Sequence, residues 1–379
     1  MIASSEIALY CHYPWCLNKC PYCDFNSFHK KANCHDSEYI LALCQDLIHS
    51  ASWAQKRTVT SIFFGGGTPS LLSANLVAKV IHVIHNHYQV GTDCEITLEM
   101  NPASLQAQHL KNLKQIGINR LSIGAQSFSS RHLRLLGRAH NPEAIFRTYE
   151  AAIQAGFENI NLDLMYHLPD QNLSEALSDL NTLILLNPSH ISWYELTMEP
   201  NTQFAKNPPS RACEDEAFKM TKDGLEILAK HGYRRYEVSA FTRDKTCRHN
   251  LQYWQFGDYI GCGNGAHSKM SHQGKQYRWQ RKKAPTFYVA QPLVEHQKRI
   301  LDDEEILFEY MLNHLRLVKP ISRQHFEKTT GLHWQDVKSM VYKSHLTEYF
   351  KLSEQMLCLT EHGRWFLNDC VSVFLNKIT

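Results

Sequence analysis

The sequence predicts an α/β protein in which residues 1–240 form a partial (β/α)6 barrel and a small, mostly helical domain follows. Three observations predict this class. Apolar segments of strand length alternate with amphipathic helical segments through the first 240 residues. Motifs of glycine and polar residues follow the ends of successive strands. After about residue 280 the composition becomes more charged and the apolar spacing becomes helical.

The order of the segments supports the barrel. Strands are expected at 7–13, 60–64, 95–99, 120–123, 159–165, 190–196 and 236–240. Helices are expected between them at 36–52, 74–88, 105–116, 142–154, 174–185 and 215–230. Right-handed crossovers place such strands side by side in parallel, so a TIM-like barrel is expected, with functional loops at the carboxyl ends of its strands.

Residues 286–379 are expected to form a C-terminal, winged-helix-like domain. Helices are expected at 302–316, 322–329, 334–344 and 361–376, with a hairpin at 346–352 and 356–359. Acidic residues 302–305 suit the positive end of the first helix. Winged-helix modules often bind DNA, but this one lacks a dense basic helix, so we expect a covering or docking role without nucleic acid.

Charge and cysteine usage narrow the class of protein. Lys and Arg number 40 and Asp and Glu 37, and a net charge of +3 is too small to indicate a nucleic-acid partner. We recognise neither a secretory signal nor an apolar run of eighteen residues, so no transmembrane segment is expected. The twelve cysteines are irregularly spaced outside one motif, which fits free thiols in a reducing cytoplasm.

That motif is Cys16, Cys20 and Cys23, spaced C-x3-C-x2-C just after the first strand. Four thiolates normally hold the four irons of an iron–sulfur cluster, so three thiolates leave one iron open to a small molecule. A zinc site or structural thiols are the alternatives. Zinc loops usually carry a second Cys or His pair, and none follows nearby, so the spacing favours a 4Fe–4S cluster.

Residues suited to a bound nucleoside follow the next strands. The run 65–69, Gly-Gly-Gly-Thr-Pro, allows close approach of backbone to a ligand. Glu99 suits ribose hydroxyls, with a solvated strand end as the alternative, and Gln126 offers an amide. The guanidinium of Arg138 suits a carboxylate or phosphate. Asp163 lies within an apolar strand and needs a partner, for which Arg138 and a ligand are candidates.

Together these motifs resemble the radical S-adenosylmethionine (SAM) superfamily and, within it, the coproporphyrinogen-dehydrogenase-like branch. The resemblance implies a radical SAM barrel in which SAM chelates the open iron. It implies contacts with the cluster-bound SAM for Tyr10, Tyr22 and Glu99. It implies SAM contacts, several of them with a second SAM molecule, for Gly66, Gly67, Thr68, Gln126, Arg138 and Asp163.

Two departures separate the chain from the dehydrogenases of that branch. Phe25 stands where they carry a fourth cysteine, and only fifteen residues precede Cys16. In both respects the chain resembles the HemW family of heme chaperones. This resemblance implies that coproporphyrinogen oxidase activity is absent. Oxygen-independent coproporphyrinogen III oxidation is the alternative function, and the sequence leaves open whether SAM is cleaved productively.

Residues 249–254, His-Asn-Leu-Gln-Tyr-Trp, match the HNxxYW motif of HemW proteins and lie in an expected connecting segment, 241–285. The resemblance associates this motif with heme. Its imidazole, that of His249, is a common type of axial ligand to heme iron. An ordinary segment between domains is the alternative reading, and Cys247, Cys262 and His267 are further candidate ligands. The resemblance also implies delivery of heme to acceptor proteins, with membrane-bound respiratory enzymes and a homodimer as candidate partners.

Overall fold

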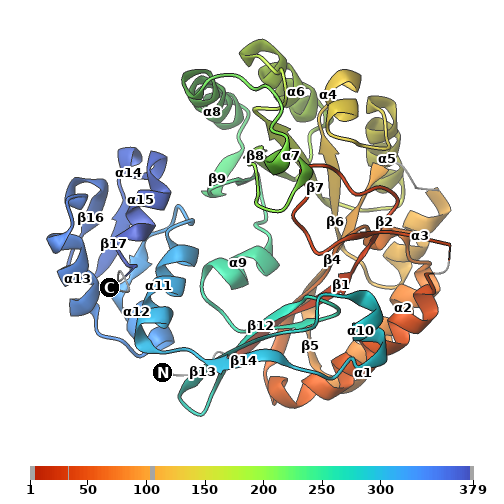
Figure 1. Ribbon diagram of the computed structural model, residues 1–379, viewed down its shortest axis with the longest axis horizontal. Coiled ribbons are helices and arrows are strands. Elements are labelled where there is room, and N and C mark those ends of the chain that lie inside the picture. The colour runs from red at the N-terminus through yellow and green to blue at the C-terminus, as the bar shows by residue number, and fades with distance from the viewer. Residues whose placement is uncertain (1–4, 33, 103–106, 376–379) are drawn as a thin grey trace.

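The chain folds around one curved sheet (Figure 1). The computed structural model describes residues 5–32, 34–102 and 107–375. Its central strands are β1 (Glu6–Tyr13), β4 (Thr58–Gly66), β5 (Gln89–Met100), β6 (Arg120–Gln126), β7 (Asn159–Tyr166) and β8 (His190–Glu195). Each pairs in parallel with the next, so their carboxyl ends meet at one end of the sheet, as predicted.

Helices cover the convex side of these strands (Figure 1). They are α1 (Asp36–Ala54), α2 (Ala74–His87), α3 (Ala107–Gln115), α5 (Pro142–Gln154), α6 (Leu173–Leu186) and α8 (Glu214–Lys230). Local capping fixes their starts. Helix α6, for example, begins with a capping box in which Asn172 and Glu175 each accept from the other's backbone N–H. The start predicted at 105 for the third helix lies outside the described residues.

The two edges of the sheet do not follow the predicted alternation. One edge consists of β11 (Tyr259–Cys262), β12 (His267–His272), β13 (Lys275–Gln280) and β14 (His296–Ile300); the other consists of β10 (Ala240–Thr242) and β9 (Arg234–Glu237). Only β11 is parallel to its inner neighbour. Among the described residues the order is β14-β13-β12-β11-β1-β4-β5-β6-β7-β8-β10-β9, so the barrel is partial and open.

The single strand predicted at 236–240 is wrong, because the chain reverses within it. Strands β9 and β10 are antiparallel and are joined by a turn. The Glu237 carboxylate accepts a hydrogen bond from Ser239 N at 3.0 Å, which stabilises that turn. Propensity alone gave no sign of this side-chain contact.

The expected connecting segment contributes directly to the sheet. It holds α9 (Arg248–Trp254), β11, β12 and β13, and α10 (Pro285–Ala290) follows. Helix α9 lies within the curve of the sheet (Figure 1), where His249 contacts Phe63 of β4 and Tyr10 of β1. The HNxxYW motif therefore faces the interior of the partial barrel.

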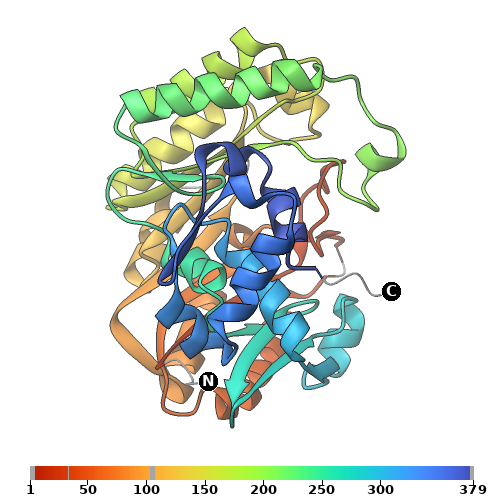
Figure 2. The same cartoon turned by 90° about the vertical axis from the view of Figure 1, so that its left-hand side faces the viewer.

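The C-terminal domain has a separate apolar core built around Tyr310, Phe326 and Trp334, and it faces the viewer in Figure 2. It comprises α11 (Asp303–His314), β15 (Ile321–Ser322), α12 (Arg323–Thr330), α13 (Trp334–Lys343), β16 (Phe350–Leu352), β17 (Met356–Leu359), α14 (Glu361–Trp365) and α15 (Leu367–Ser372). The predicted hairpin is confirmed as β16 and β17. The predicted last helix is interrupted at Phe366, and position 376 lies outside the described residues.

Candidate functional site

The three motif cysteines lie on a loop just beyond the carboxyl end of β1. Short strands β2 (Trp15–Cys16) and β3 (Phe28–His29) pair in parallel and bring the two ends of this loop together. Within it, Cys23 N donates to Cys20 O at 3.1 Å. Pairing and turn therefore present all three thiols from one compact loop.

The thiols are free and only partly buried. Burial raises the pKa of the Cys16 and Cys23 thiols, and hydrogen bonds from Ser27 lower the pKa of both. Arg138 Nη1 lies 3.8 Å from Cys20 Sγ, so a guanidinium faces the third thiol. In the described part of the chain, no three His, Cys, Asp or Glu side chains converge closely enough to hold a single metal ion.

Gly66 and Gly67 bring bare backbone against the cysteine loop. Gly66 has a φ of +114°, and a Cβ there would lie 2.4 Å from the ring of His12. A Cβ at Gly67 would lie 2.6 Å from Trp15 O. The next residue, Thr68, is buried and its N–H donates to the same Trp15 carbonyl at 2.8 Å. A side chain at either glycine position would clash, so the two glycines allow this loop to pack tightly against His12 and the cysteine loop.

Glu99 lies on β5 beside this glycine loop and accepts from Gly66 N at 3.1 Å. Burial, and then the charge of Asp163, raises the pKa of the Glu99 carboxyl to about 8. No cation forms an ion pair with it among the described residues. The carboxyl is thus poorly solvated and short of donors, which disfavours the alternative of a freely solvated strand end and suits hydroxyl donors from a ligand.

Asp163 and Arg138 do not pair with each other. Asp163 accepts from Asn161 Nδ2 at 2.7 Å and from Ser122 Oγ at 3.2 Å, and burial raises the pKa of its carboxyl. Arg138 Nη2 instead donates to Gly124 O at 2.9 Å. Its Nε is buried without a hydrogen-bond partner in the described structure, so this guanidinium retains a donor for a bound acceptor.

Aromatic residues surround these polar groups. Tyr10 OH lies 3.0 Å from His12 Nδ1, and Tyr22 packs beside Phe204 with ring centroids 6.3 Å apart. Burial raises the pKa of the Tyr10 and Tyr22 hydroxyls, so both are neutral donors at neutral pH. Gln126 has a φ of +67°, and its side-chain oxygen accepts a hydrogen bond from Tyr194.

Two residues of the site gave no motif in the sequence. Tyr194 on β8 donates to Gln126 Oε1 at 3.0 Å. His12 bridges Tyr10 and the cysteine loop, because its Nε2 lies 3.0 Å from Asn26 O. Burial lowers the pKa of His12 to about 4, so the imidazole is neutral. The alternation of side chains along β1 predicts that His12 and Tyr13 lie on opposite faces of the strand. It does not predict the contact between His12 and Asn26.

These groups fit a cluster and SAM. Three thiols are available as iron ligands, the Glu99 carboxyl lies beside the glycine loop with a single backbone donor, and Arg138 keeps a donor for a carboxylate. Metal binding requires the thiols to lose their protons, and the iron itself would drive that loss. The donor set matches an amino acid linked to a nucleoside.

The HNxxYW motif lies deeper in the partial barrel. His249 is 1% exposed; its Nδ1 lies 3.0 Å from Ser61 Oγ and its Nε2 lies 2.8 Å from Tyr253 OH. The ring stacks on Phe63 with centroids 4.9 Å apart. Burial lowers the pKa of His249 to about 3. Both nitrogens are engaged, so ligation of an iron by His249 requires these hydrogen bonds to be exchanged.

The three further candidate ligands differ in access. Cys247 and Cys262 are buried. Burial raises the pKa of the Cys247 thiol to about 12, and it also raises the pKa of the Cys262 thiol. His267, at the start of β12, is exposed. Burial of part of its ring and the charge of Arg278 lower the pKa of His267, which favours the neutral imidazole that binds iron.

Comparison with known proteins agrees with this geometry. Residues 10–183 match the model of the radical SAM superfamily, and residues 301–366 match the HemN C-terminal domain. The chain is 39% identical to the heme chaperone HemW of Escherichia coli over 99% of this chain and 100% of that protein. The chain belongs to the HemW family. It is also 32% identical to the Bacillus subtilis heme chaperone HemW over 97% of this chain and 99% of that protein.

A solved structure shares the fold of this HemW-family chain. Coproporphyrinogen III oxidase HemN from Escherichia coli superposes with a TM-score of 0.84 over 97% of this chain and 90% of that one, at 22% identity. The predicted radical SAM fold with its appended C-terminal domain is thereby confirmed. Among the described residues, no helix is both long and apolar enough to span a bilayer.

Proposed function

We propose that this chain is a heme chaperone, which binds heme beside a 4Fe–4S cluster with SAM and delivers the heme to acceptor proteins. The observation that carries the proposal is full-length identity of 39% to a protein named heme chaperone HemW, together with the HNxxYW motif inside the partial barrel. The proposal includes membrane-bound respiratory enzymes as heme acceptors and a homodimeric state. It also includes a cytoplasmic location, because free thiols persist in a reducing compartment.

In this proposal the cysteine loop holds the cluster. Cys16, Cys20 and Cys23 would ligate three irons, and a bound cluster would supply electrons for reductive cleavage of SAM. The chain's own residues orient the ligand: Glu99 accepts from the ribose hydroxyls, Arg138 donates to a carboxylate, and Gly66 and Gly67 let the loop beside Glu99 pack against the cysteine loop. Further contacts with SAM come from five residues around it, and a second SAM is among their proposed ligands: Tyr10, Tyr22, Thr68, Gln126 and Asp163.

Oxygen-independent coproporphyrinogen III oxidation is the second candidate, favoured by the fold shared with HemN. We predict that this activity is absent. Phe25, in the place of a fourth cysteine, is 57% exposed and offers no thiol there. Orientation beside a reactive group accounts for about 7–11 kcal/mol of a barrier, so an oxidase would need side chains that hold the porphyrinogen against the bound SAM.

One anaerobic experiment tests the proposal. The full chain, with its cluster reconstituted and SAM added, is incubated with coproporphyrinogen III, and a parallel sample is titrated with hemin and then mixed with an apo-form heme enzyme. Saturable hemin uptake and transfer, without formation of protoporphyrinogen IX, is the expected result. Porphyrinogen turnover would favour the oxidase, and the absence of hemin binding would overturn the chaperone.

A further inference from the structure

A chain of buried hydrogen bonds runs from Asp163, at the proposed SAM site, to helix α9, which carries the HNxxYW motif. Asn161 and Asp163 alternate along β7, so their side chains lie on the same face of the strand. Asn161 Nδ2 donates to Asp163 Oδ1 at 2.7 Å and to Ser122 Oγ at 2.8 Å. These two contacts fix the orientation of the Asn161 amide, because in the opposite orientation its oxygen would face the carboxylate.

His190 of β8 continues the chain. It lies opposite Asn161 in the parallel register, is 0% exposed, and its Nδ1 lies 2.6 Å from Asn161 Oδ1. The amide oxygen can only accept, so His190 Nδ1 carries the proton and its Nε2 is an acceptor. Burial lowers the pKa of His190, which keeps the ring neutral. Tyr236 OH of β9 therefore donates to His190 Nε2, at 2.8 Å.

The chain ends at the start of α9. The Tyr236 oxygen accepts from Cys247 N at 3.4 Å, the longest step of the chain, and Cys247 is the N-cap residue of the helix. Every N–H and O–H of the chain therefore donates in the direction of Asp163. Hydrogen bonds aligned in this way polarise and strengthen one another in a buried environment. A change at the carboxylate is thus expected to reach the first turn of α9.

A buried cation is shared by the two ends of this chain. Arg120 of β6 is 3% exposed. Burial raises the pKa of the Asp163 carboxyl, and the charge of Arg120 opposes that effect. Burial lowers the pKa of His190 and of His249 in the motif, and the charge of Arg120 lowers both further. The SAM side and the motif therefore share an electrostatic environment as well as a chain of hydrogen bonds.

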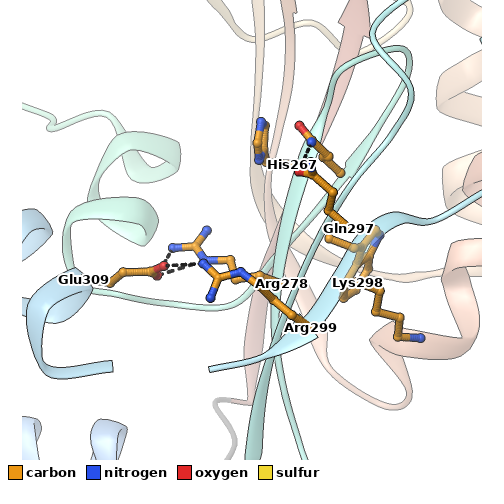
Figure 3. Close-up of a pocket in the computed structure, with 8 residues that line it drawn as sticks. His267, Arg278, Gln297, Lys298, Arg299 and Glu309 are labelled. Carbon is orange, nitrogen blue, oxygen red and sulfur yellow. Dashed lines mark hydrogen bonds and ion pairs between the residues drawn. The ribbon is translucent and has the colours of Figure 1, made fainter. Parts of the chain in front are cut away.

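The opposite side of α9 is held from outside the barrel. Tyr253 of the motif packs edge to face on Tyr259 with ring centroids 4.4 Å apart, and the Tyr259 hydroxyl contacts Arg278. Arg278 Nε donates to Glu309 Oε2 of α11 at 2.9 Å, and Figure 3 shows this guanidinium directed at Glu309. Because the sheet edge and α11 hold this side, an adjustment of α9 is expected at its start, where the chain of hydrogen bonds ends.

We propose, on the basis of the heme-chaperone function proposed above, that this chain couples the two ligands: SAM bound near Asp163 orders the start of α9 and thereby tightens heme binding. SAM carries a positive sulfonium, which favours the ionised carboxylate. A hydrogen bond to an ionised acceptor is about twice as strong as a neutral one. The strengthened chain holds Cys247 N, and a motif that is already ordered costs less to bind. His190 and Tyr236 are positioning residues, which act through Asp163 and Cys247.

The coupling is tested by titrating hemin into the full, reconstituted chain with and without saturating SAM. SAM should tighten hemin binding by about 5-fold or more, and hemin should tighten SAM binding by the same factor. In Tyr236→Phe, which removes only the hydroxyl in the middle of the chain, this factor should fall towards one. Tyr233→Phe is the matched control and should keep the full factor, because the Tyr233 hydroxyl is also buried but donates to Pro188 O, at 2.8 Å.

An affinity for hemin that SAM does not change would overturn the coupling. An unchanged factor in Tyr236→Phe, or an equal loss in Tyr233→Phe, would do the same. If the wild-type chain binds no hemin, the chaperone function fails, and amide hydrogen exchange with SAM alone decides the role of the chain. SAM should slow exchange at residues 248–254 in the wild-type and Tyr233→Phe chains but not in Tyr236→Phe. Exchange that SAM leaves unchanged in the wild-type chain, or slows equally in Tyr236→Phe, would overturn the link between Asp163 and α9.

Discussion

Single residues of the site are adapted to ligands by burial rather than by ion pairs. Glu99 has one backbone donor, and its carboxyl pKa is raised to about 8 by burial and by Asp163. In the chain without ligand this carboxyl is therefore mostly protonated at pH 7. Donors from a ribose would favour the ionised form, so SAM binding should be coupled to loss of that proton.

Glu99→Gln should weaken SAM binding, since hydrogen bonds to a carboxylate contribute about 1.5–3 kcal/mol each. The affinity of the wild-type chain should also rise between pH 6 and pH 9, as the Glu99 carboxyl ionises, and this rise should be smaller in the variant. Isothermal titration at three pH values on the reconstituted chain measures both. Glu158→Gln, at an exposed position, is the control, and a full iron content should persist in both variants.

Replacement of single cysteines distinguishes the cluster ligands from the other thiols. Cys20→Ser should abolish 4Fe–4S reconstitution, because an alcohol is a poor iron ligand and only three thiols stand on the loop. Cys34→Ser, outside the motif, should reconstitute normally, and so should conservative replacements of Cys11 and Cys262. Iron and sulfide analysis after anaerobic reconstitution decides the matter; a full complement in Cys20→Ser would place the cluster elsewhere.

At the level of elements, helix α9 is fixed to the sheet by polar contacts at its start. His249 hydrogen-bonds with Ser61 and Tyr253, and His249 N donates to Glu95 Oε1 at 3.3 Å. All of these groups lie in or near the core of the partial barrel. Removing one partner leaves the others buried and unsatisfied, which costs about 1–3 kcal/mol for each group.

His249→Phe should accordingly lower the free energy of unfolding by about 2–4 kcal/mol, although the ring stack on Phe63 is retained. The double variant His249→Phe with Ser61→Ala should recover part of the loss, because the serine hydroxyl is no longer left unpaired. Urea unfolding followed by circular dichroism measures both. Additive losses in the double variant would contradict the role assigned to the Ser61 contact.

The elements differ in how far the sequence predicts them. Strands β1, β4, β5, β6, β7 and β8 and helices α1, α2, α5, α6 and α8 follow from apolar periodicity. The cluster interpretation follows from the cysteine spacing together with the motifs that close the next strands. Strands β12 to β14 could not be predicted in the same way, because they are poor in apolar residues and include Lys269, Arg278 and Arg299. The contacts Arg278–Glu309 and His12–Asn26 join distant parts of the chain, which no local pattern records.

Across the whole molecule, buried histidines set the response to acid. Burial lowers the pKa of His12 and His140 to about 4 and that of His249 and His314 to about 3. In the unfolded chain these imidazoles would become protonated near pH 6.5. Unfolding therefore takes up protons below that pH, and the free energy of unfolding decreases as the pH falls. Buried carboxyls act in the opposite direction, among them Glu99 and Asp179, whose pKa values burial raises to about 8 and about 6. The histidines with a lowered pKa are more numerous than the carboxyls with a raised one.

The free energy of unfolding should therefore fall as the pH decreases from 6.5 to 4.5. His314→Gln should reduce the difference between pH 7 and pH 5 by about 2 kcal/mol, because one depressed imidazole no longer contributes. Urea unfolding at the two pH values measures it. His345→Gln, at an exposed position, should leave the difference unchanged; an unchanged difference in His314→Gln would mean that this imidazole titrates normally.

An open sheet has two edges, and the chain protects each of them differently. Along β9, Glu237 bridges to Leu317 and Val318 N donates to Tyr236 O at 3.0 Å, so a segment of the C-terminal domain occupies that edge. Along β14, a register shift opposite Arg278 and Gln280 and the charges of Lys298 and Arg299 interrupt regular pairing. Both devices discourage strand addition by another chain, so the opening that exposes the interior does not create a template for aggregation.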